Sequence, residues 1–73
     1  MNLYAVPSEQ LPSDTTELLL DHNNIQELSS SAFVNLNNIV RLSLRFNSLS
    51  HLSKDSLIHL PNLENLDVGD NPI

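Results

Sequence analysis

The stretch from Ile39 to Leu49 reads IVRLSLRFNSL, with two leucines two residues apart and an asparagine three residues after the second. The same arrangement recurs once before and once after this stretch, at a constant interval along the chain. The matched positions are Leu18, Leu20, Asn23 and Ile25, then Leu42, Leu44, Asn47 and Leu49, then Leu66, Val68, Asn71 and Ile73. A unit this short cannot bury its apolar side chains alone, so its copies are expected to stack as a solenoid.

Each repeat is expected to begin with a short strand. Leu18 and Leu20 alternate with Glu17, Leu19 and Asp21, and this period of two is typical of a strand with one buried face. The second and third repeats show the same alternation. The strands of successive repeats are therefore expected to form a short parallel sheet on the concave face of the solenoid.

The rest of each repeat is expected to form the convex face. The second strand is expected at Val40 to Arg45, followed by a turn at Phe46 to Ser48. Ser29 and its repeat mate Ser53 are predicted to cap a short helix or 3₁₀ turn by accepting hydrogen bonds from free backbone N–H groups. The predicted fold class is therefore α/β, with a concave parallel sheet and short helical, 3₁₀ or irregular convex segments.

Residues 1–14 precede the regular pattern and are rich in proline and other turn-forming residues. Proline fixes φ and lacks an N–H donor, so this part is predicted to be an extended leader with one short edge strand near Leu3 to Val6. Its apolar side chains, Leu3, Val6 and Leu11, are expected to cover the open edge of the first repeat.

The recurring asparagines have a physical reason. After each strand the chain must bend sharply, which leaves buried backbone groups without partners, and an amide offers both donors and an acceptor to satisfy them. Asn23, Asn47 and Asn71 are therefore predicted to stack as an asparagine ladder that serves their own turn and the neighbouring one. The alternative is that they are ordinary exposed turn residues.

Charge and composition argue against several classes of partner. The formal net charge is −6, with only Arg41, Arg45 and Lys54 positive, which argues against nucleic acid and anionic membrane surfaces. The longest strongly apolar run is Leu18 to Leu20, far short of the roughly 20 residues that cross a bilayer. No charged stretch followed by an apolar segment comes after Met1, so no export signal is expected in these residues. The chain has no cysteine, so disulfides give no indication of its compartment.

The outward-facing strand positions are expected to form columns across the sheet. Strands lie about 4.8 Å apart, so Glu17 is expected to pair with Arg41 and Asp21 with Arg45. Such pairs either only stabilise the sheet, by about 0.2–1 kcal/mol each, or also form a patch that binds a charged protein surface. The candidate partner-binding residues are Glu17, Leu19, Asp21, Arg41, Ser43, Arg45, Phe46, Asn65 and Asp67.

Two apolar residues on or beside this face have two interpretations each. Phe46 follows the second strand, where it is either an exposed anchor for a partner or a ring packed against the turn. Leu19 is the one leucine on the predicted outward face, and it is either covered by the leader or part of the contact surface. Both residues are kept among the partner-binding candidates.

Catalytic motifs are missing from the sequence. His22, His51 and His59 have no cysteine partners and no spacing such as HExxH, so no metal site is predicted. The serines form no GxSxG motif, and one glycine, Gly69, is too few for a phosphate-binding loop. No catalytic residue and no cofactor are therefore expected, and the chain is predicted not to be an enzyme.

The repeat resembles the leucine-rich repeat family, whose pattern LxxLxLxxNxL is matched with conservative changes at Ile39 to Leu49 and Leu63 to Ile73. The first copy departs from it at Thr15, where the pattern has leucine. The resemblance divides the chain into a leader or partial N-terminal cap at residues 1–14 and repeats at 15–38, 39–62 and 63–73. The phrase LPSDTTEL at Leu11 to Leu18 is similar to extracellular members such as Toll-like receptors, Slit-like proteins and small proteoglycans.

This resemblance implies a function. It indicates a protein-binding segment of an extracellular receptor or matrix protein whose concave face binds a protein ligand, with a cytosolic scaffold protein as the alternative. The cysteine-rich caps of such proteins are absent, so the chain is expected to be a piece of a longer array. Leu63, Val68 and Ile73 are then expected to form an exposed apolar end through which the chain self-associates.

Overall fold

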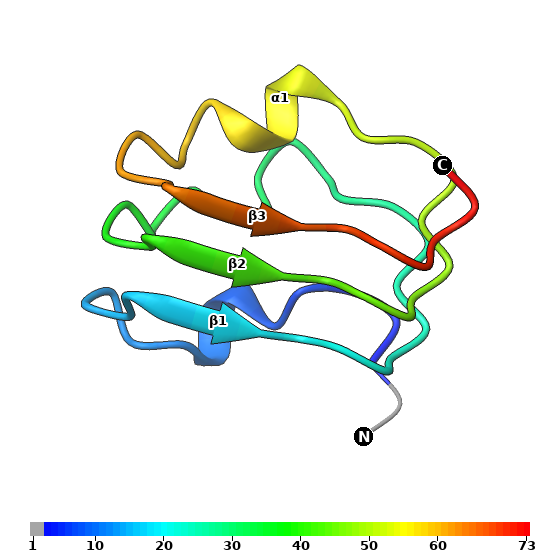
Figure 1. The fold of residues 1–73 in the computed structure, drawn as a ribbon. Helices are drawn as coiled ribbons and strands as arrows, with labels where there is room; N and C mark the ends of the chain where they lie inside the picture. Colours follow the sequence, from blue (N-terminus) through cyan, green and yellow to red (C-terminus); the bar gives the residue numbers. More distant parts are fainter. Residues whose placement is uncertain (1–2) are drawn as a thin grey trace.

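The computed structural model describes residues 3–73, and its secondary structure follows the repeat. In chain order the elements are the 3₁₀ helix η1 (Ser8–Gln10), strands β1 (Glu17–Leu19) and β2 (Arg41–Ser43), helix α1 (Lys54–Leu57) and strand β3 (Asn65–Asp67). The strands form one parallel sheet in the order β1-β2-β3, and Figure 1 shows them side by side with the connecting segments behind. This arrangement confirms the predicted α/β leucine-rich repeat solenoid.

The strand register repeats the period of the sequence. Leu18 pairs with Leu42 and Leu42 pairs with Leu66, so each turn of the solenoid, called a coil below, advances the chain by one repeat period. β2 is shorter than the predicted strand at residues 40–45, yet backbone pairing between coils continues beyond it. The Phe46 N–H donates to the Gly69 carbonyl at 3.3 Å. The register determines the period and not where a unit begins, so the boundaries at residues 15, 39 and 63 stay predictions.

The core lies between the sheet and the convex segments. In the first coil the fully buried side chains lie after the strand, and in the second they lie in and around β2 and in the following turn. The largest are Ile25, Phe33, Leu36, Ile39, Leu42, Leu44 and Leu49. All residues of β3 are exposed, because coils pack on only one side of this strand. Leu66 is 37% exposed and Ile73 is 57% exposed. Self-association through this end stays a prediction.

The convex segments differ between the first two coils. Ser53 caps α1, because its hydroxyl accepts a hydrogen bond from the Asp55 N–H at 3.1 Å. Ser29 has no such role, because residues 30–35 form turns and its hydroxyl lies 3.4 Å from that of Ser31. The buried Ser56 hydroxyl donates to the Leu28 carbonyl at 2.8 Å and thereby joins the two segments. Among residues 3–73 no helix has the length and hydropathy needed to cross a bilayer.

The leader packs against the first coil without adding a strand. The edge strand predicted near Leu3 to Val6 is wrong, because Leu3 hydrogen-bonds to the turn after β1 and not to the edge of the sheet. Its N–H donates to Asn23 Oδ1 at 3.0 Å, and its carbonyl accepts from the Asn24 N–H at 2.8 Å. Leu3, Val6 and Leu11 are partly buried against the core.

Candidate functional site

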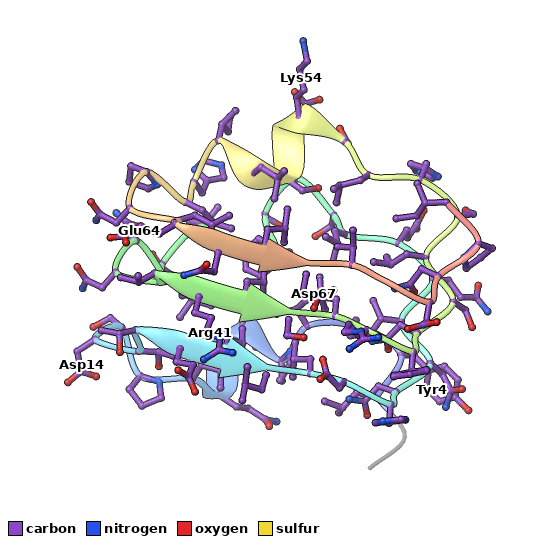
Figure 2. The ribbon with its side chains drawn as sticks, viewed as in Figure 1. Tyr4, Asp14, Arg41, Lys54, Glu64 and Asp67 are labelled. Atoms are coloured by element: carbon purple, nitrogen blue, oxygen red, sulfur yellow. The ribbon has the colours of Figure 1, made fainter. Side chains whose placement is uncertain are left out.

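The candidate site is the concave face of the sheet, where alternate side chains of the three strands point outward. The register aligns Glu17 with Arg41 and Asn65, and it aligns Leu19 with Ser43 and Asp67. Figure 2 shows the side chains of Arg41 and Asp67 lying over this face, whereas Lys54 extends from α1 away from it. The face is therefore assembled from residues that lie far apart in the chain.

One predicted ion pair is present near the start of the strands. Arg41 Nη1 lies 3.7 Å from Glu17 Oε2, and about half or more of each side chain is exposed. An exposed pair of this kind contributes about 0–1 kcal/mol, because solvent screens it. Its position on the outer surface leaves both charged groups open to a partner.

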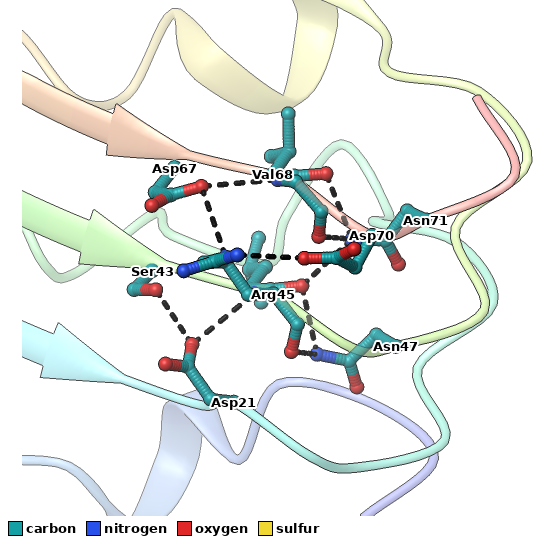
Figure 3. A network of polar contacts seen from close by, with 10 residues as sticks. Asp21, Ser43, Arg45, Asn47, Asp67, Val68, Asp70 and Asn71 are labelled. Carbon is teal, nitrogen blue, oxygen red and sulfur yellow. Dashed lines mark hydrogen bonds and ion pairs between the residues drawn. The ribbon is translucent and has the colours of Figure 1, made fainter.

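The second predicted pair, between Asp21 and Arg45, is not formed as expected. The Arg45 guanidinium turns toward the third coil, where Nη2 donates to Asp70 Oδ2 at 2.7 Å and Nε lies 3.7 Å from Asp67 Oδ1. Asp21 accepts instead from the Arg45 backbone N–H at 3.1 Å. The hydrogen bond to Asp70, followed by the charge of Asp67, raises the pKa of Arg45 above its ordinary value. Figure 3 shows this network, in which Arg45 joins the first and third coils.

Gly69 and Asp70 make this arrangement possible, and sequence reasoning assigned neither a role in the network. A Cβ atom at Gly69 would lie 3.3 Å from both Arg45 Nε and Asp67 Oδ1, so glycine leaves room for the guanidinium. Asp70 lies one repeat period after Phe46, in the same register. That spacing could have shown, from the sequence alone, that Asp70 lies beside residues of the second coil.

Ser43 is a predicted partner-binding residue that the structure buries. It is only 8% exposed, and its hydroxyl donates to Asp21 Oδ1 at 2.6 Å. It acts on the face by positioning Asp21, and direct contact with a partner is not expected.

A hollow of about 500 Å³ opens over β2 and β3, lined by Arg41, Leu42, Ser43, Asn65, Leu66 and Asp67.

Leu19 and Asn65 remain accessible. Leu19 is 55% exposed, so the described leader residues do not cover it. Asn65 in β3 is also exposed. Leu19 therefore adds an apolar surface to this polar face. Backbone pairing continues past β1 to His22, so Asp21 lies on the same face as Leu19.

Phe46 combines the two alternatives considered from the sequence. Its ring is 44% exposed, and it also stacks on the His22 ring at a centroid distance of 4.5 Å and an interplanar angle of 7°. Arg45 Cζ lies 5.1 Å from the centroid of the same ring.

The turn residue at this position has a positive φ in all three repeats: 61° at His22, 58° at Phe46 and 59° at Asp70. These values lie in the left-handed region, which is unfavourable for residues with a Cβ.

The asparagine ladder lies at the edge of this face. Asn47 Oδ1 accepts from the Ile25 N–H of the preceding coil at 3.1 Å, and its Nδ2 donates to the carbonyls of Leu20, Leu44 and Arg45. Asn71 repeats this arrangement, with Oδ1 accepting from the Leu49 N–H at 3.0 Å. Asn23 accepts from Leu3 and donates to the carbonyls of Leu20 and Asp21. These bonds hold the turns that carry Asp21, Arg45 and Gly69.

No group of three or more histidine, aspartate or glutamate side chains within residues 3–73 is placed to hold a metal ion.

Comparisons with known proteins agree with this geometry. The leucine rich repeat family profile matches residues 13–73. The chain is similar to decorin from Oryctolagus cuniculus, with 38% identity over 60 residues that make up 82% of this chain and 16% of that protein. It is similar to epiphycan from Gallus gallus, with 37% identity over 71 residues, 97% of this chain and 22% of that protein. Human decorin is 39% identical over 56 residues, 77% of this chain and 15% of that protein. The chain therefore spans less than a quarter of the length of these relatives.

Proposed function

Because this chain belongs to the leucine-rich repeat family, we propose that it is a protein-binding segment of an extracellular matrix protein or receptor, and that it binds its protein ligand on the concave face. The similarity to decorin and epiphycan, which are small leucine-rich proteoglycans, supports the extracellular assignment.

One observation carries the proposal. The concave face presents an exposed leucine, Leu19, between charged side chains that are themselves accessible, Glu17, Arg41 and Asp21. Exposed apolar side chains beside accessible polar ones are a usual feature of protein-binding surfaces. The parallel sheet fixes the backbone positions from which these side chains project, which lowers the entropic cost of binding.

The proposal is tested by capturing ligands from an extracellular matrix extract on the immobilised chain and then measuring the affinity of the purified ligand by surface plasmon resonance. Arg41→Glu should change the affinity, because it reverses a charge on the concave face. Lys54→Glu changes the net charge by the same amount on α1 and should leave the affinity unchanged. Equal effects of both substitutions, or an effect of Lys54→Glu alone, would contradict binding on the concave face.

A further inference from the structure

We propose that Asp21 is the residue of the concave face that receives a basic side chain, lysine or arginine, from the protein partner, with Leu19 packing against the aliphatic part of that side chain. This inference rests on the proposed function and specifies which group of the ligand the face recognises. It is carried by the hydrogen bonds of Asp21, by the ion pairs of the other acids, and by the exposure of Leu19.

The carboxylate of Asp21 is held in place through one of its two oxygens. Oδ1 accepts from the Ser43 hydroxyl at 2.6 Å and from the Arg45 N–H at 3.1 Å, as Figure 3 shows. The backbone on either side is also held, because the Leu20 N–H donates to the Ser43 carbonyl and the His22 N–H to the Arg45 carbonyl. Within residues 3–73, Oδ2 accepts no hydrogen bond. An exposed carboxylate fixed in this way has one oxygen oriented to accept from a donor outside the chain.

The other acids of this face already have cationic partners. Glu17 pairs with Arg41, and Asp67 and Asp70 pair with Arg45. In the described part of the chain, no cationic nitrogen forms an ion pair with the Asp21 carboxylate, because the Arg45 guanidinium is directed to the third coil. Asp21 acts on the Arg45 guanidinium only through space, so a positive group in direct contact with the Asp21 carboxylate is what the face leaves open. The net charge of −6 favours the approach of a basic partner.

Leu19 indicates that this positive group belongs to a side chain with an aliphatic stem. Leu19 and Asp21 are two residues apart in extended backbone, so their side chains lie on the same face. Leu19 is 55% exposed. Lysine and arginine pack their methylene groups on apolar surface while their charged ends bind a carboxylate. Because Oδ1 already has two donors, a bidentate arginine contact is not available, and lysine and arginine are expected to serve alike.

The test uses random peptides displayed on phage and selected on the immobilised chain. Peptides that bind the concave face are recognised because Arg41→Glu changes their affinity and Lys54→Glu does not. Each such peptide is expected to contain a lysine or arginine, and Asp21→Asn should weaken its binding about ten-fold, since a charged hydrogen bond is lost. Asp55→Asn, which removes the same charge from α1, should have no effect.

Two controls keep the outcome interpretable. Asparagine at position 21 retains an oxygen for the Ser43 and Arg45 donors, so its far-UV circular dichroism and urea midpoint should match those of the wild type. Replacing the basic residue of a peptide by norleucine should remove the difference between wild type and Asp21→Asn. Concave-face peptides that bind both proteins equally would overturn the role of Asp21 and leave the proposed function intact. Failure to select any peptide sensitive to Arg41→Glu would overturn both.

Discussion

Replacing Asn47 by alanine tests whether the asparagine ladder stabilises the fold. Asn47 is 9% exposed and makes four hydrogen bonds to backbone groups of two coils. The substitution removes all four at once. The consequences for the individual backbone groups differ, because some of them have a second partner.

The three carbonyls keep a partner after the substitution. Leu20 still accepts from Asn23, Leu44 from Asn71, and Arg45 from the His22 N–H. The Ile25 N–H, in contrast, has no other acceptor among residues 3–73, and Ile25 is fully buried. Leaving one buried donor unsatisfied costs about 1–3 kcal/mol, and the weakened carbonyl interactions place the expected loss in the upper half of that range.

Urea unfolding followed by far-UV circular dichroism measures this loss. The control is Asn35→Ala, which replaces an exposed asparagine whose side chain makes no hydrogen bond in the described structure, and it should change stability by less than about 0.5 kcal/mol. Amide hydrogen exchange adds a local measurement, because the Ile25 N–H should exchange faster in Asn47→Ala. Equal unfolding free energies for the two variants, or unchanged exchange at Ile25, would refute the reasoning.

Three further predictions concern the fold. Ser53→Ala should lower the free energy of unfolding by about 1 kcal/mol, because it removes the cap of α1. Ser29→Ala should leave the free energy of unfolding nearly unchanged in the same urea titration, and equal losses would contradict the capping role of Ser53. Phe46→Gly should be more stable than Phe46→Ala by about 1 kcal/mol, because glycine adopts the positive φ without strain. Thermal unfolding measures the difference, and the opposite order of stability would exclude strain at this residue. Leu44→Ala should lower the free energy of unfolding by about 2–5 kcal/mol and Leu19→Ala by close to nothing, because Leu44 is 0% exposed and Leu19 is 55% exposed. Similar unfolding midpoints for the two variants would contradict this difference in burial.

The pairing of Arg45 shows why sequence reasoning predicted the columns correctly and one ion pair wrongly. The repeat period is enough to place Asp21 beside Arg45 in adjacent coils. It does not tell which of several nearby acids the guanidinium contacts. That choice depends on the Ser43 hydroxyl, which binds Asp21, and on Gly69, which leaves space toward Asp67 and Asp70. These are three-dimensional relations among side chains and backbone turns of different coils, and a linear period does not contain them.

The sequence by itself determined the period, which strand leucines point toward the core, and the positions of the asparagines. Alternation of apolar residues and a fixed spacing directly encode which side chains face inward and which residues align between coils. Only the tertiary structure decided where the leader's backbone hydrogen bonds go, which acids Arg45 contacts, and which oxygen of Asp21 remains open. In each case several polar groups compete for the same partner. The result depends on distances between side chains of different coils, which are close to one another only in the folded chain.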